Sequence, residues 1–193
     1  MNYAFGQPQQ VEKRKVFVSF HSADQAYRDE FDRLFGDHFI SMSVDRGDID
    51  PENETEYIKR MIQQEHIVQS SVVIALYGKE TYKRKHVDWE ISGGLSGKVG
   101  GHKGLIIILL PEFPVWPFDA LGQFNQSLLH PYLHPRTATN VNSGYAAVHS
   151  WPGMYPQLPA VFIGDIVEGA ANRRETHNHL IDNSHEQYKY NLA

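Results

Sequence analysis

The chain has no cysteine among its 193 residues. Disulfide bonds and thiolate metal sites are therefore excluded, and a reducing compartment is expected. Residues 1–10 are polar and contain no apolar segment of the kind found in a signal peptide. The longest strongly apolar run, Leu105 to Leu110, is far shorter than the roughly 20 residues that cross a bilayer. We therefore expect a cytoplasmic protein with no membrane partner.

The chain also lacks an excess of positive charge, because its formal net charge is -5. This balance gives no basic surface for nucleic acid, so we expect no nucleic-acid partner. Hydrophobic residues make up 41% of the chain and aromatic residues 12%, which is typical of a globular protein. The length suits one domain with a full core and some appended elements.

What is present is an alternation of strands and helices. Apolar runs that suit buried strands lie at 16–20, 72–77 and 105–110. Apolar and polar residues alternate at 40–45, which predicts a second strand in chain order, and 145–151 is a candidate for a fifth. Apolar residues at helical spacing follow each of the first three predicted strands in chain order, and a last amphipathic helix is predicted from Pro159 to about Glu175. This order predicts an α/β fold in which a parallel sheet carries helices on both faces.

Three parts are expected along the chain. Residues 1–12 form a loose lead, residues 13–175 form the domain, and residues 176–193 form a polar tail that packs on the domain or trails from it. Prolines break the domain into loops and short elements after Pro111, so its C-terminal part is expected to carry loop and helix additions.

Polar and aromatic residues follow the carboxyl ends of the predicted strands, where open parallel sheets bind ligands. The residues expected at this rim are Phe20, His21, Ser22, Asp45, Arg46 and Tyr77. The simpler interpretation is that such a rim is polar because its loops are exposed to water.

The stretch at 85–94 reads KHVDWEISGG and has helical spacing. Glu90 lies at the edge of its apolar face, and Gly93, Gly94 and Gly97 follow on the same side. Each glycine costs about 1 kcal/mol in a helix, and together they would leave backbone that a flat ligand can approach. The alternative is that the helix ends at Gly93 and Gly94, with Glu90 solvated.

Three segments taken together resemble a bacterial TIR-like domain of the ThsB type, from the Thoeris antiphage system. They are 16–21, 71–77 and 85–91, and a later segment at 135–151 resembles the same group. The resemblance covers about residues 13–175. It implies a flavodoxin-like sheet, which agrees with the order of elements.

The resemblance also implies an activity, namely cleavage of NAD+ at the nicotinamide–ribose bond by a glycohydrolase or cyclase. Glu90 matches the family's catalytic carboxylate, within a hydrophobic-x-aromatic-Glu stretch. The segment from Phe20 through His21 to Ser22 matches the lining of the nucleotide pocket in relatives. His86 stands where many relatives carry Trp, four residues before the Glu, so the shape of the pocket differs here.

In this interpretation NAD+ is the substrate and no separate cofactor is needed. An ADP-ribose-derived product would reach a downstream effector, and a homo-oligomer is expected on activation.

A single carboxylate suffices for this chemistry, because nicotinamide leaves as a neutral base from a cationic ring. The carboxylate opposes the positive charge that develops on the ribose. Phe20 is the better candidate to hold a flat ring, because Trp89 points away from Glu90 on the helical wheel and is expected in the core. Ser22 or Arg46 would hold pyrophosphate oxygens.

Two other classes of protein fit the fold. A non-catalytic TIR scaffold would signal through self-association alone. A receiver domain would need an acidic pair after the first strand, where this chain has Phe20, His21 and Ser22. No metal site is expected, because prolines interrupt the spacing of His130 and His134 and the other clustered histidines lie in the polar tail.

Overall fold

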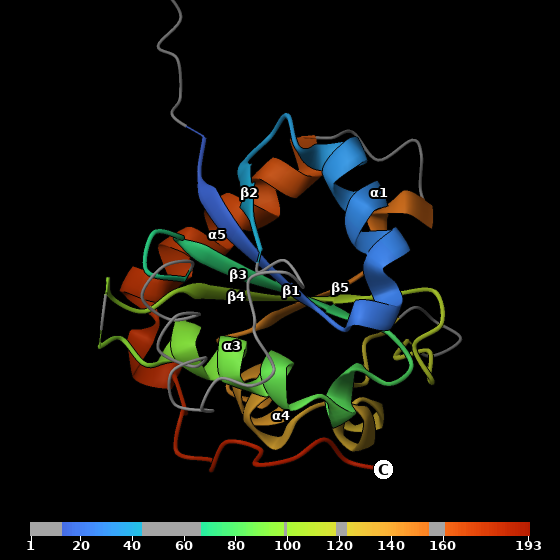
Figure 1. The fold of residues 1–193 in the computed structure, drawn as a ribbon. Helices are drawn as coiled ribbons and strands as arrows, with labels where there is room; N and C mark the ends of the chain where they lie inside the picture. Colours follow the sequence, from blue (N-terminus) through green and yellow to red (C-terminus); the bar gives the residue numbers. More distant parts are fainter. Residues whose placement is uncertain (1–12, 44–66, 99, 119–122, 155–160) are drawn as a thin grey trace, which may run out of the picture.

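A computed structural model of the chain describes residues 13–43, 67–98, 100–118, 123–154 and 161–193. Its architecture has three layers, with a central sheet between two layers of helices (Figure 1). The predicted helix after the second strand, together with Asp45 and Arg46, lies outside the described residues.

The sheet has five parallel strands in the order β2-β1-β3-β4-β5. Their bounds are Lys15–Phe20 for β1, Ile40–Met42 for β2, Val72–Tyr77 for β3, Gly104–Leu109 for β4 and Ala147–Ser150 for β5. The middle strands β3 and β4 are buried along their whole length, as the continuous apolar runs predicted. The predicted α/β fold with a flavodoxin-like parallel sheet is confirmed by this strand order.

Four helices of the described residues cover the two faces of the sheet. Their bounds are Gln25–Phe35 for α1, Lys85–Leu95 for α3, Pro135–Asn142 for α4 and Val161–Thr176 for α5. Helices α1 and α5 lie on one face, and α3 and α4 lie on the other (Figure 1). None of the helices in the described part of the chain is long and apolar enough to cross a membrane.

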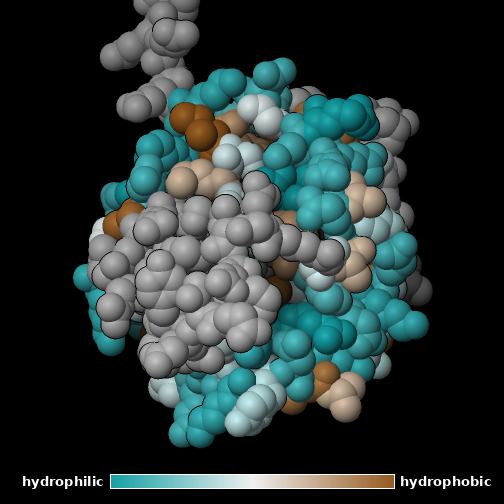
Figure 2. All heavy atoms as spheres, in the orientation of Figure 1, coloured by the Kyte–Doolittle hydropathy of each residue, from teal (hydrophilic) through white to brown (hydrophobic). Residues whose placement is uncertain are grey.

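Alternation of side chains along the strands builds a separate core under each helical layer. The core under α1 and α5 takes Val16 and Val18 from β1 and Val72, Ile74 and Leu76 from β3. The core under α3 and α4 takes Phe17 from β1 and Val73, Ala75 and Tyr77 from β3. On the face drawn in Figure 2, the coloured surface of the described residues is mostly hydrophilic.

The structure rules out the alternative end of the helix that carries Glu90. Helix α3 does not end at Gly93 and Gly94 but continues to Leu95. At the start of α1, the side chain of Asp24 makes no capping hydrogen bond. Helix α4 was not predicted, because Pro135 was read as a break, although proline is favoured at the first position of a helix.

Candidate functional site

The site is built around Glu90, which α3 holds against the carboxyl-terminal part of β1. Side chains alternate along β1, so Ser19 follows Phe17 on the face that α3 covers. The hydroxyl of Ser19 donates a short hydrogen bond to Oε2 of Glu90. Glu90 is only 8% exposed. The alternative of a solvated carboxylate is therefore wrong, and Glu90 faces the sheet.

Burial governs the electrostatics of this carboxyl group. Removal from water raises the pKa of Glu90 to about 8, while the hydrogen bond from Ser19 lowers it. Among the described residues, no Lys, Arg or His forms an ion pair with Glu90. The group is thus an acid whose proton is held by its environment near neutral pH, which is the kind of perturbation found at functional sites.

The exit of β1 lies beside this carboxylate because it begins at the residue after Ser19. Phe20, His21 and Ser22 are all half-buried, at the carboxyl end of the sheet. Side chains alternate along β1, however, and Phe20 packs against the core under α1 and α5, on the opposite face from Ser19 and Glu90. The predicted rim segment is thus next to Ser19 in sequence, while the Phe20 ring lies on the other side of the strand.

A basic residue that sequence analysis missed also reaches this end of the sheet. Arg28 on α1 is 7% exposed, and its Cζ lies 6.0 Å from the centre of the Phe20 ring. It donates hydrogen bonds of 3.1 Å to the hydroxyls of Ser41 and Ser43 and forms an ion pair with Asp32. The available signal was its spacing, because Arg28 lies three residues before a buried phenylalanine and so belongs to the inner stripe of α1.

The loop after β1 is tied to the loop after β3 by Asp24. This carboxylate is 8% exposed and accepts a 3.1 Å hydrogen bond from Thr81 Oγ1. It lies directly over Gly78, where a Cβ atom would come within 2.6 Å of its oxygens. Burial raises the pKa of Asp24. Asp24 therefore joins the loops that follow β1 and β3.

Tyr77 does not lie at the rim, so this part of the prediction was wrong. Its side chain is fully buried and points toward α4, where its hydroxyl contacts His134 Nδ1 at 2.7 Å and Thr137 Oγ1 at 2.8 Å. Burial raises the pKa of Tyr77 and lowers that of His134 to about 4. Both groups are therefore neutral parts of the core.

The backbone around the glycines is not open to a flat ligand as expected. A Cβ atom at Gly94 would lie 2.7 Å from Cγ2 of Val73, so the glycine lets α3 approach β3 closely. Gly97 has a φ of +65°, and a Cβ atom there would lie 2.4 Å from the ring of His102. Protein atoms occupy the space that these two glycines leave.

These features match a known family. The family described as Thoeris protein ThsB, TIR-like domain, matches residues 17–113, which include Ser19, the exit of β1 and Glu90. The chain belongs to this family. The TIR-like domain is also similar to the TIR domains in a structure titled "Structure of the activated Roq1 resistosome directly recognizing the pathogen effector XopQ", at 12% identity and a TM-score of 0.39. That match covers 87% of this chain and 83% of the other. The chain matches no curated protein.

His86 lies one turn before Glu90 on α3 of the TIR-like domain. Its ring is half-buried and packs edge-on against Trp89, with ring centres 4.8 Å apart. Burial, and then the charge of Lys85, lowers the pKa of His86. Trp89 itself is 1% exposed, which confirms that it belongs to the core and does not hold a ligand ring.

No metal centre is evident in the described part of the TIR-like domain, where no three His, Cys, Asp or Glu side chains converge. His134 is committed to Tyr77 and to the backbone carbonyl of Arg84. His130 contacts Asn142 instead. Among the described residues, the arrangement offers one buried carboxyl group and an adjacent hydroxyl, followed in sequence by the half-buried exit of β1.

Proposed function

We propose that this TIR-like domain cleaves NAD+ at the nicotinamide–ribose bond, with Glu90 as the catalytic carboxylate. The observation that carries the proposal is the burial of Glu90 against Ser19 at the carboxyl end of β1. Ligands bind at that end of open parallel sheets. Membership of the ThsB family supports the same reaction and a role in antiphage defence.

The reaction breaks the bond between the nicotinamide nitrogen and ribose C1′, and the electron pair leaves with nicotinamide. The ribose gains positive charge as the bond lengthens, and a nearby carboxylate stabilises that charge. The acceptor is water, which gives ADP-ribose and a proton, or a hydroxyl of the same nucleotide, which gives a cyclic product. Such a product would be the signal for a downstream effector.

The raised pKa of Glu90 fits this role. In the free protein near neutral pH, the carboxyl group is largely protonated. The cationic nicotinamide ring of NAD+ favours the carboxylate, so binding of NAD+ is coupled to loss of this proton. In a buried site the resulting charge acts more strongly than it would in water.

The other groups at the rim are assigned to binding. The proposal assigns the Phe20 ring, which lies on the α1 side of β1, to stacking on a flat base, and the Ser22 hydroxyl to binding the pyrophosphate. His21 and His86 are proposed as further binding residues. Arg28 adds positive charge next to Phe20. Asp45 and Arg46 remain proposed members of the site from the sequence alone.

The test compares nicotinamide release from NAD+ by the wild type, Glu90→Gln and Glu175→Gln. Glu175 is the matched control, because it is an exposed carboxylate at the end of α5. We expect Glu90→Gln to lose about 100- to 1000-fold in kcat, as removal of one preorganised electrostatic group commonly does. Glu175→Gln should match the wild type. Circular dichroism and thermal unfolding check that each variant is folded.

Equal turnover by the wild type and Glu90→Gln would contradict the assignment. Absence of turnover by the wild type, even at high protein concentration where subunits can associate, would favour the non-catalytic scaffold. Mass spectrometry of the small molecules would then identify the product of an active protein as linear ADP-ribose, a cyclic isomer or an adduct.

A further inference from the structure

Residues 182–192, here called the C-terminal strap, lie along helix α3. The strap passes beneath α3 and α4 in Figure 1 and runs in the direction opposite to α3. Asn183 contacts the last turn of α3, Tyr188 contacts its middle, and Asn191 contacts its first residue. The strap thus follows the whole helix that carries Glu90.

The strap caps α3 near both ends. Side-chain Oδ1 of Asn191 accepts a 3.0 Å hydrogen bond from the backbone N–H of Lys85. Side-chain Nδ2 of Asn183 donates a 3.0 Å hydrogen bond to the carbonyl of Ser92. The first N–H groups and last C=O groups of a helix have no partner within the helix. The residue before α3, Arg84, makes no side-chain capping bond, so the strap supplies what the local sequence does not.

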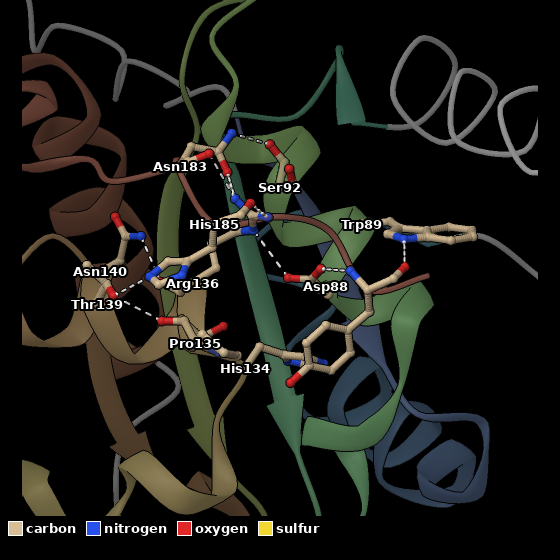
Figure 3. A network of polar contacts seen from close by, with 12 residues as sticks. Asp88, Trp89, Ser92, His134, Pro135, Arg136, Thr139, Asn140, Asn183 and His185 are labelled. Atoms are coloured by element: carbon tan, nitrogen blue, oxygen red, sulfur yellow. Dashed lines mark hydrogen bonds and ion pairs between the residues drawn. The ribbon is translucent and has the colours of Figure 1, made fainter. Parts of the chain in front are cut away.

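The middle of the strap is fixed by buried groups of α3 (Figure 3). Trp89 Nε1 donates to the carbonyl of Tyr188 at 2.7 Å, and Asp88 Oδ2 accepts from the N–H of Tyr188 at 2.8 Å. Asp88 also pairs with Arg136 of α4 at 3.2 Å, and both side chains are at most 2% exposed. A buried ion pair needs its remaining hydrogen-bonding positions filled, and the strap fills them.

Arg136 completes this network from the side of α4. It donates to the backbone carbonyls of Asn183 and His185 and to the side-chain oxygen of Asn183 (Figure 3). Asn140 adds a pair of hydrogen bonds with the backbone of Asp182. The strap therefore bonds α3 and α4 together along the outer side of that layer.

Helix α3 lies between the sheet and the strap, and Glu90 belongs to its inner side. Asp88 and Trp89 hold the strap, while Glu90 contacts Ser19 on β1. An isolated helix of this length is marginal, and Gly93 and Gly94 weaken it further. Its register against β1 sets where the carboxylate lies, so the contacts that fix this register also fix Glu90.

We propose that the C-terminal strap positions Glu90 for NAD+ cleavage, with Asn191 as a positioning residue that acts through the first turn of α3. This inference rests on the proposed function. A misplacement of about 1 Å at a reacting group can cost on the order of 100-fold in rate. Loss of a single cap is a smaller disturbance, so the expected effect is smaller.

The experiment uses the full chain with Asn191→Ala, Asn191→Asp and the neighbouring control Tyr190→Ala. Tyr190 is 79% exposed and, among the described residues, its side chain makes no hydrogen bond. Asn191→Asp keeps an acceptor and adds a negative charge, which is favourable at a helix N-terminus. The readouts are amide hydrogen exchange of each element, kcat and KM for nicotinamide release, and the pKa of Glu90 by carbon NMR.

We expect Asn191→Ala to speed hydrogen exchange about fivefold in the first turn of α3, the effect of losing a typical cap. Exchange in α1 and α5 should not change. The kcat should fall about tenfold with KM unchanged, which marks loss of an interaction in the transition state. Asn191→Asp should restore both values, and Tyr190→Ala should behave as the wild type.

Three results would overturn the inference. Exchange in α3 could be unaffected by Asn191→Ala, exchange could rise equally in all elements, or α3 could loosen with no change in kcat. If the wild type does not cleave NAD+, the proposed function fails on its own. The role of the strap is then tested by the pKa of Glu90 alone. If the strap holds Glu90 in its buried position, this pKa should be lower in Asn191→Ala than in the wild type. An unchanged pKa would overturn the inference.

Discussion

The hydroxyl of Ser19 on β1 donates a hydrogen bond to the carboxyl group of Glu90 on α3, across 71 residues of sequence. The bond favours the charged form of Glu90, while burial of the side chain favours the neutral form. Burial has the larger effect, so the pKa of Glu90 lies at about 8. Glu90 therefore changes its protonation state in the pH range around 8.

The rate of NAD+ cleavage should depend on pH through Glu90. We expect kcat/KM for nicotinamide release to rise with pH and to level off above a midpoint near 8, because the carboxylate is the active form. Ser19→Ala removes the hydrogen bond that favours the carboxylate, so its midpoint should move to higher pH. Initial rates between about pH 6 and about pH 9 measure both profiles.

Ser70→Ala serves as the control, because Ser70 is buried but bonds only to the backbone carbonyl of Ile67, away from Glu90. Its midpoint should equal that of the wild type. A profile that is flat or falls with pH, or a midpoint that moves down in Ser19→Ala, would show that Glu90 does not act as a carboxylate.

The same pKa predicts a stability difference between the wild type and Glu90→Gln. The pKa of Glu90 is raised from 4.5 to about 8 on folding, so between these values the folded state holds a proton that the unfolded state releases. The stabilisation that results from this bound proton is fully present below the unfolded pKa of 4.5 and is lost as pH rises through the folded pKa of about 8. Glutamine does not titrate, so Glu90→Gln should gain stability relative to the wild type as pH rises.

Urea unfolding of both proteins at about pH 5 and about pH 8.5 measures this change, and each pKa unit corresponds to about 1.4 kcal/mol. At each pH the two proteins are compared with each other, so the effects of other titrating groups cancel. His134, whose pKa is lowered to about 4, is one such group. An equal stability difference at the two pH values would mean that Glu90 is not buried in solution as it is in the structure.

The strands were predictable because burial on both faces leaves a continuous apolar signal. The run at 72–77 gave the bounds of β3 without error, and β4 differed by one residue at each end. The orientation of Tyr77 could also have been predicted, because alternation along the strand places it on the same face as Val73 and Ala75. Its partners on α4 were not, because they lie 57 and 60 residues further along the chain.

Two helix-interior glycines should respond to alanine in opposite ways. A Cβ atom at Gly94 would come within 2.7 Å of Val73, whereas no atom lies within 4 Å of a Cβ at Gly169 of α5. We expect Gly94→Ala to lower the free energy of unfolding by about 1–3 kcal/mol through overpacking. Gly169→Ala should raise it by up to about 1 kcal/mol through helix propensity.

Urea unfolding of the two variants measures this pair. Stabilisation by both substitutions would show that α3 can move away from β3 at no cost, and the close contact at Gly94 would then have no role. The sequence alone could not separate these glycines, because both interrupt a helical pattern in the same way. The two glycines differ because α3 contacts β3 closely at Gly94, whereas α5 leaves open space at Gly169.

The position of Glu90 was assigned from a short motif, but its surroundings were not. Ser19 was read as one residue of an apolar strand, and Arg28 was assigned no role. Both are polar residues on buried faces, and only the packing of α3 and α1 on the sheet shows what they contact. Long-range contacts of this kind leave no periodic signal in a chain.

The strap is recognised mainly by its main chain. Trp89 and Arg136 bond to the peptide groups of Asn183, His185 and Tyr188, which every amino acid but proline would offer almost unchanged. Most side chains of the strap can therefore change in evolution without loss of these main-chain hydrogen bonds. Equivalent straps in relatives would be found by looking for the tryptophan and the arginine that bond to them. A C-terminal segment without a sequence motif that lies beside such a pair should be treated as part of the site.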